Sequence, residues 1–144
     1  MRLTAYSDYA LRLLMYVALR KDSLATIQDV AEAYGISKNH LMKVAFDLGR
    51  QGLLETVRGR GGGLRLACPP EEIRLGELLR QTEDGFKTVE CFDPERNACV
   101  ITGSCRLRGI LGEAMAAYLK VLDRYTLADL TARNTALARQ LLDA

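Results

Sequence analysis

Apolar residues recur every three or four positions along the first fifty residues, and this period predicts three short amphipathic helices. We place these helices at about residues 4–20, 27–34 and 38–51. Gly35 can end the second helix in the left-handed conformation, and Ser37 is then placed to cap the third. Two short helices joined by Gly-Ile-Ser form a helix-turn-helix pattern.

The third predicted helix has a clear division between its two faces. Its apolar residues are expected to face the core: Leu41, Val44, Ala45 and Leu48. Its outward N-terminal residues are then Lys38, Asn39, His40 and Lys43. In a helix-turn-helix protein, this end of the second helix enters the major groove of DNA. The alternative from this segment alone is a small helical hairpin with a solvated polar face.

A change of period after this helix predicts a β-hairpin. Residues 53–58 and 64–67 are expected to form two strands joined by the glycine-rich residues 59–63. Such a hairpin is the wing of a winged helix, and its arginines Arg58, Arg60 and Arg65 are candidates for DNA phosphates or the minor groove. A nucleotide-binding glycine loop is rejected, because it would lead into a helix whereas this chain continues to Cys68-Pro69-Pro70.

The second half is predicted to contain a short helix at 73–82, an irregular stretch at 83–104 and helices at 105–125 and 126–142. The long helix has apolar residues stepping by four and three: Leu107, Leu111, Ala114, Tyr118, Val121 and Tyr125. It would be roughly 30 Å long, too long for a small winged helix to cover. We therefore expect a homodimer, with an intrachain helical hairpin as the alternative. The predicted fold class is mainly α with a small β-hairpin wing.

Charge supports a nucleic-acid partner only locally. The net charge is +2, but residues 37–65 carry six Lys or Arg against two acids, whereas residues 66–144 carry ten against twelve. No apolar run is long enough to cross a membrane, and the N-terminus does not resemble a signal peptide. The expected location is the cytoplasm, where thiols stay reduced.

Three cysteines in the irregular stretch carry the candidate metal chemistry. Cys91, Cys99 and Cys105 are separated by seven and five residues, unlike the closely paired cysteines of structural zinc sites. Three thiolates on an irregular loop suit an iron–sulfur cluster, with a thiol switch as the alternative. Cys68 could be a fourth ligand but is more typical of a small buried residue. The predicted domains are a winged helix at 1–70, a short helix and cluster-binding loop at 71–104, and dimerisation helices at 105–144.

Several motifs together resemble the winged-helix iron–sulfur transcription regulators. They are residues 1–4 (MRLT) with 7–12 (SDYALR), 35–41 (GISKNHL), 57–64 (VRGRGGGL), the three spaced cysteines and 125–130 (YTLADL). The combination is most similar to the nitric-oxide-sensing repressor branch of that family. The branch that regulates cluster assembly has a histidine shortly after the third cysteine, where this chain has Arg106-Leu107-Arg108.

The resemblance implies a repressor that binds double-stranded operator DNA as a homodimer and responds to nitric oxide. It implies Cys91, Cys99 and Cys105 as cluster ligands, and Asp8 as a fourth ligand supplied by the opposite subunit. The alternative for Asp8 is a surface ion pair with Arg12. The gap between Cys91 and Cys99 is longer than the family pattern, so [2Fe-2S] and [4Fe-4S] clusters both stay open.

Two other functions fit parts of the sequence. A regulator of the same architecture could sense iron–sulfur status, iron or redox state. A cluster-bearing electron carrier or enzyme is disfavoured, because the chain has no nucleotide-binding motif and no catalytic carboxylate pair, and a carrier would have no use for a basic wing.

Overall fold

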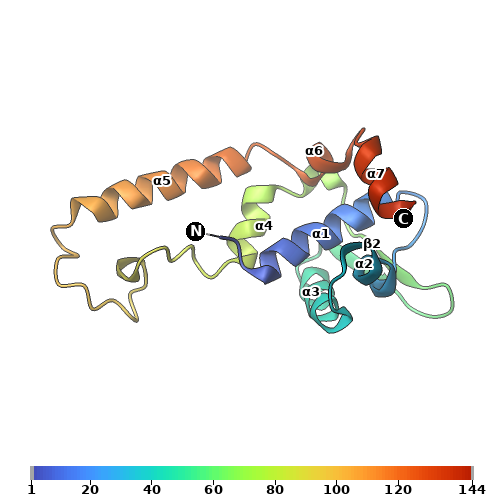
Figure 1. Cartoon of the computed structure of the whole chain (residues 1–144), viewed down its shortest axis with the longest axis horizontal. Helices are drawn as coiled ribbons and strands as arrows, with labels where there is room; N and C mark the ends of the chain where they lie inside the picture. The colour runs from blue at the N-terminus through green and yellow to red at the C-terminus, as the bar shows by residue number, and fades with distance from the viewer. Residues whose placement is uncertain (1, 144) are drawn as a thin grey trace.

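Local capping interactions set the bounds of the first helices in the computed structural model, which describes residues 2–143 (Figure 1). Helix α1 (Ala5–Leu19) begins where the Ser7 N–H donates to Thr4 Oγ1 at 3.2 Å. Helix α2 (Ile27–Tyr34) begins at a full capping box between Thr26 and Asp29. It ends at Gly35, whose φ of +66° favours glycine. Met1, where the MRLT motif begins, and Ala144 lie outside the described residues.

Helix α3 (Lys38–Arg50) and the wing form where the sequence predicts them, although Ser37 occupies the N-cap position of α3 without a side-chain capping hydrogen bond. All four apolar residues assigned to the inner face of α3 are buried. Strands β1 (Leu54–Val57) and β2 (Gly63–Leu66) pair antiparallel; β1 is two residues shorter than expected, and β2 begins one residue earlier than expected. Ala25 and Leu64 exchange two backbone hydrogen bonds, at 3.0 and 2.7 Å. At Gly63 a Cβ would lie 2.8 Å from the Ala25 carbonyl oxygen, so this close pairing requires glycine.

A single hydrophobic core holds these elements together around α1. Leu13 and Leu14 are fully buried at its centre, and Leu127 and Leu141 join it from the C-terminal region. The expected single helix at 126–142 is wrong: the chain forms α6 (Leu127–Thr131) and α7 (Thr135–Leu142). The break has a local cause, because Arg133 has a φ of +61° and Asn134 then caps α7 by accepting from the Leu137 N–H. Both helices pack against the α1–α2 region rather than extending α5.

Helix α5 (Arg106–Leu122) extends away from this core (Figure 1), and none of its residues is buried. Its C-terminal end is joined to α4 (Leu75–Thr82) through Asp123, whose carboxylate accepts from both Arg80 terminal nitrogens, one at 2.8 Å. Gly76 permits this approach, because the Asp123 carboxylate occupies the space that a Cβ would need. None of the helices within residues 2–143, α5 included, has the length and apolar character of a membrane span.

Candidate nucleic-acid interface and cysteine loop

The N-terminal end of α3 carries the predicted DNA-contacting residues on its surface. Lys38, Asn39, His40 and Lys43 are all exposed. The His40 ring stacks on the Tyr9 ring of α1, with 6.1 Å between the ring centroids and an interplanar angle of 28°. His40 is therefore at the edge of this surface that faces α1.

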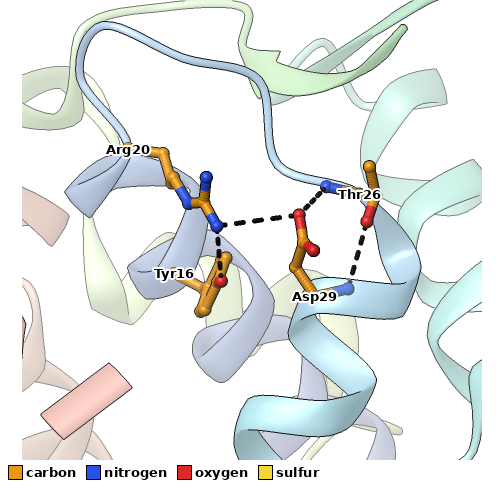
Figure 2. Close-up of polar contacts among 4 residues, drawn as sticks. All are labelled: Tyr16, Arg20, Thr26 and Asp29. Atoms are coloured by element: carbon orange, nitrogen blue, oxygen red, sulfur yellow. Dashed lines mark hydrogen bonds and ion pairs between the residues drawn. The ribbon is translucent and has the colours of Figure 1, made fainter. Parts of the chain in front are cut away.

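The first helix of the helix-turn-helix is fixed to α1 by one arginine, as Figure 2 shows. The Arg20 Nη2 atom donates to the Tyr16 hydroxyl at 3.1 Å and lies 3.7 Å from Asp29 Oδ2. The hydrogen bond to Tyr16 is the main cause that raises the pKa of Arg20 above its ordinary value. Asp29 also closes the capping box of α2, so the same carboxylate orients α2 and anchors it to α1.

The wing presents its three arginines in two different states. Arg58 and Arg60 are exposed at the tip, where Gly59 and Gly61 adopt φ of +99° and +74°. Arg65 lies on β2 opposite Glu55 and donates to both carboxylate oxygens at 2.9 Å. This hydrogen bonding lowers the pKa of Glu55. The charge of Arg65 is therefore partly neutralised by its own sheet, whereas the tip arginines are free to reach outward.

The cysteine loop is organised by hydrogen bonds to the backbone of Cys91 and Cys99 and by the position of Cys105 at the start of α5. Cys91 lies in a 3₁₀ turn (Glu90–Phe92), and its carbonyl accepts from Arg108 Nε of α5 at 3.4 Å. Cys99 lies in a turn where its N–H donates to Asn97 Oδ1 at 3.1 Å and its carbonyl accepts from the Thr102 hydroxyl at 2.8 Å. Cys105 is the N-cap residue of α5. The segment from Cys91 to Cys105 is thus tied to α5 at both of its ends.

The donor set fits an iron–sulfur cluster in kind, because three half-buried thiols lie on one loop. A single chain does not present a closed metal site: within residues 2–143, no three His, Cys, Asp or Glu side chains lie close enough together to hold a metal ion. Cys68 behaves as a structural residue. It packs against the hydrophobic core, and burial, with a smaller effect of Glu72, raises the pKa of its thiol.

Asp8 lies in the first turn of α1 and is paired within its own chain. Its carboxylate binds Arg12 through contacts of 2.9 and 3.1 Å, and the Arg12 guanidinium lies 5.7 Å from the centre of the Tyr34 ring of α2. The predicted surface pair is therefore present. Both side chains are about two-fifths exposed, so the Asp8 carboxylate is also accessible from outside the chain.

The same first turn of α1 contacts both the cysteine loop and the third helix, which the sequence did not reveal. The Thr4 N–H donates to Glu83 Oε1 at 2.8 Å, at the point where the chain leaves α4 for the loop. The Tyr6 hydroxyl donates to Asp47 Oδ2 of α3 at 2.8 Å. No local signal marks these pairs, because their partners are separated by 79 and 41 residues.

Comparisons with known proteins identify relatives over most of the chain. The model of the Rrf2 family, described as an iron-dependent transcriptional regulator, matches residues 3–133. The HTH-type transcriptional regulator NsrR of Halalkalibacterium halodurans is 55% identical over 131 residues, which are 90% of each chain. NsrR of Bacillus subtilis is 56% identical over 131 residues, again 90% of each chain. These relatives are regulators of transcription and not enzymes.

The fold also matches a solved regulator. CymR of B. subtilis, the global cysteine regulator, superposes with a TM-score of 0.73 at 24% identity, covering 92% of this chain and 97% of CymR. At this identity the match concerns the fold alone. It confirms the predicted fold class, a mainly helical chain with a small antiparallel wing.

Proposed function

Because the chain belongs to the Rrf2 family of transcriptional regulators, we propose that it represses transcription as an operator-bound homodimer and releases DNA in response to nitric oxide. It is a regulator and not an enzyme, and the sequence resemblance to winged-helix iron–sulfur regulators of the NsrR type is confirmed. The proposal adds the dimer, the cluster, the signal and a cytoplasmic location. The name of its relatives and the placement of its own residues support these additions.

The DNA-binding role rests on two surfaces of one rigid core. Lys38, Asn39 and Lys43 would enter the major groove, with His40 at the edge beside α1. Arg58 and Arg60 would contact the flanking backbone or minor groove, and Arg65 would do so when it leaves Glu55. Phosphate contacts of this kind make affinity depend strongly on salt.

The homodimer accounts for the exposed apolar surface of α5. Leu107 and Ile110 are 58% and 53% exposed, and Val121 is 45% exposed. Tyr125, which the sequence assigned to the same helix, lies beyond the end of α5 at Leu122 and is 46% exposed. A second copy of α5 packed along this seam would remove these side chains from water. Operators that are read by a two-fold symmetric protein contain paired half-sites, which gives the dimer a role in recognition.

Cys91, Cys99 and Cys105 would hold an iron–sulfur cluster, with Asp8 of the opposite subunit as the fourth ligand. The open donor set within one chain and the accessibility of Asp8 support this assignment. When bound, the cluster supplies iron that reacts with nitric oxide. The signalling proposal rests on the contacts at the start of α1. Near Asp8, Thr4 donates to Glu83 at the start of the cysteine loop, and Tyr6 donates to Asp47 of α3.

The residues of this turn offer two arrangements for Asp8. Bound to Arg12, as in the single chain, Asp8 completes a chain of contacts through Arg12 to Tyr34 of α2. As a ligand of the partner subunit's cluster, Asp8 would no longer form the ion pair with Arg12. Because Tyr6 in the same turn bonds to α3, the choice between these arrangements can change the position of α3.

The test is anaerobic purification of the full chain, followed by iron and sulfide assays, a visible spectrum and operator binding before and after nitric oxide. The proposal predicts a cluster whose absorption falls with nitric oxide, and a parallel loss of operator binding. Protein that binds its operator tightly without iron would reject the cluster and leave a thiol switch. A cluster that responds to iron depletion or oxidants, but not to nitric oxide, would reassign the signal.

Asp8→Ala, with the exposed Asp22→Ala as its matched control, tests the fourth ligand. We expect Asp8→Ala to change the absorption spectrum and to weaken the operator affinity of the cluster-loaded protein about tenfold or more, because the substitution removes a proposed cluster ligand. Asp22→Ala should match the wild type, since Asp22 is an exposed residue of the α1–α2 connection. Identical spectra and affinities for both variants would remove Asp8 from the site.

A further inference from the structure

The outer face of α3 contains an apolar pair that the core does not use. Met42 and Phe46 are 57% and 66% exposed, although α3 is otherwise well divided into a buried apolar side and a polar outer side. They are four positions apart, so they lie next to each other on one face of the helix. Single exposed apolar residues are ordinary, but two adjacent ones on the face expected to contact DNA indicate a binding surface.

The surroundings of this pair favour a polyanion. Lys38, Met42, Phe46 and Arg50 follow each other at intervals of four residues, so cations lie at both ends of the apolar pair. Lys43 borders it from the neighbouring row and is exposed. The only acid of α3, Asp47, is engaged by the Tyr6 hydroxyl. A lipid or an apolar protein surface would not need this frame of cations.

The spacing of the residues also fits groove reading. Asn39, Met42, Lys43 and Phe46 occupy positions i, i+3, i+4 and i+7 of one helix. This is the spacing with which a recognition helix lying in the major groove presents side chains to successive base edges, as in homeodomains. In that groove, the apolar feature that distinguishes one base from the others is the C5-methyl group of thymine.

We propose that Met42 and Phe46 read thymine methyl groups in the operator half-site and so determine specificity for A·T pairs there. This inference rests on the proposed DNA-binding function and extends it from affinity to sequence choice. The lysines and Arg50 hold the helix against phosphates. The side chains of Met42 and Phe46 are then removed from water only where they contact a methyl group. A cytosine or guanine at that position would place polar base edges against these apolar side chains.

The test uses the replacement of thymine by uracil, which removes the methyl group and keeps the base pair. The full chain, purified anaerobically, first selects its preferred site from randomised duplexes. Thymines of that site are then replaced one at a time, and the affinity of wild type is compared with that of Met42→Ala/Phe46→Ala. Both residues are exposed, and alanine favours helix, so the double variant should fold.

For wild type, we expect uracil at the contacted positions to weaken binding about fourfold per methyl, the equivalent of about 0.8 kcal/mol for one buried methylene-sized group. The double variant should bind thymine and uracil sites equally. Arg50→Ala is the matched control from the same helical row: it should weaken both sites equally and keep the fourfold ratio.

Each other outcome has a defined meaning. A thymine-to-uracil ratio that is near one for wild type, or unchanged in the double variant, overturns the inference while the proposed repressor stands. A double variant that loses dimerisation instead of thymine preference also overturns it and assigns the pair to contact between copies. Selection that yields no preferred duplex at all rejects the proposed function together with the inference.

Discussion

The helices around α1 and the long helix α5 satisfy their apolar residues in different ways. Around α1, leucines from the beginning, middle and end of the chain meet in one core, and Leu13, Leu41 and Leu127 have no exposed surface. Helix α5 has no buried residue and is joined to this body through Asp123, while the start of the cysteine loop is joined to it through Glu83. The body therefore buries its own apolar residues, whereas the arm formed by the cysteine loop and α5 leaves apolar residues exposed.

This difference suits a sensor. A region that must respond to a ligand or a partner should have low stability of its own, so that binding energy can change its arrangement. A region that must keep base-reading side chains in register should be rigid. The first turn of α1 belongs to the rigid body but contacts the start of the arm through Glu83, so it is the natural point of coupling.

The largest expected effect comes from a cavity in the body. Leu13→Ala removes a fully buried side chain and should lower the free energy of unfolding by about 3 kcal/mol, within the range of such substitutions. Urea denaturation followed by circular dichroism measures this loss, which should not depend on protein concentration. The matched substitution in the arm, Ile110→Ala, should show its effect only through dissociation. If both substitutions lowered the free energy of unfolding equally and independently of protein concentration, the proposed difference between body and arm would be wrong.

The next effect tests what covers the arm. Ile110→Glu places a charge on the exposed apolar surface of α5 and should raise the dissociation constant of the proposed dimer about a hundredfold or more, because an unpaired carboxylate would be buried there. Sedimentation velocity measures this change. The exposed Lys120→Glu is the control on the polar side of α5 and should leave the dimer intact. A monomeric wild type, or equal dissociation by both variants, would contradict the α5 seam.

A third prediction concerns alkaline pH and the body alone. Burial, followed by the hydrogen bond to Asp47, raises the pKa of Tyr6 to about 12, and burial raises the pKa of Tyr34 to about 12. A phenol ionises near 10 when unfolded, so the folded state retains these protons more strongly. The resulting stability is present below about pH 10 and is lost as the pH rises towards about 12.

The free energy of unfolding should therefore fall between about pH 10 and 12, and urea titrations across that range measure its slope. Tyr6→Phe and Tyr34→Phe should each make the slope less steep, and the double variant should do so most. A slope that neither substitution changes would show that the titration of these tyrosines is not linked to folding.

The comparison also explains which features could be predicted from sequence. Local chemistry predicted the stop at Gly35 and the buried side of α3, because each depends on residues a few positions apart. The same local reasoning extended one helix across residues 126–142 and overlooked the signal that breaks it. Asn134 is a good N-cap residue, and the chain uses it to begin α7 after Arg133 turns left-handed.

The candidate site was predictable in its residue types but not in its contacts. The three cysteines, the tip arginines and the polar start of α3 follow from motif and spacing. The exposure of Met42 and Phe46 depends on which side of α3 packs against α1, and the bonds of Thr4 and Tyr6 join distant segments. Such contacts form only when the fold brings them together, so a single sequence contains no period or spacing that marks them.

The smallest expected effect lies in the wing, where Arg65 is paired with Glu55 of the neighbouring strand. Glu55→Gln removes the carboxylate that binds Arg65 and should leave stability nearly unchanged, because both side chains are exposed and surface ion pairs contribute little. Under the proposed function, the freed guanidinium can reach a phosphate. Affinity for the selected duplex should then rise about threefold at low salt, and the plot of log affinity against log salt should steepen by about one unit. Fluorescence anisotropy at several salt concentrations measures both quantities.

The control is Arg65→Ala in the Glu55→Gln background, which should reverse the gain in affinity. If the gain survives this second substitution, the loss of the acid improves binding by itself, without a contact from Arg65.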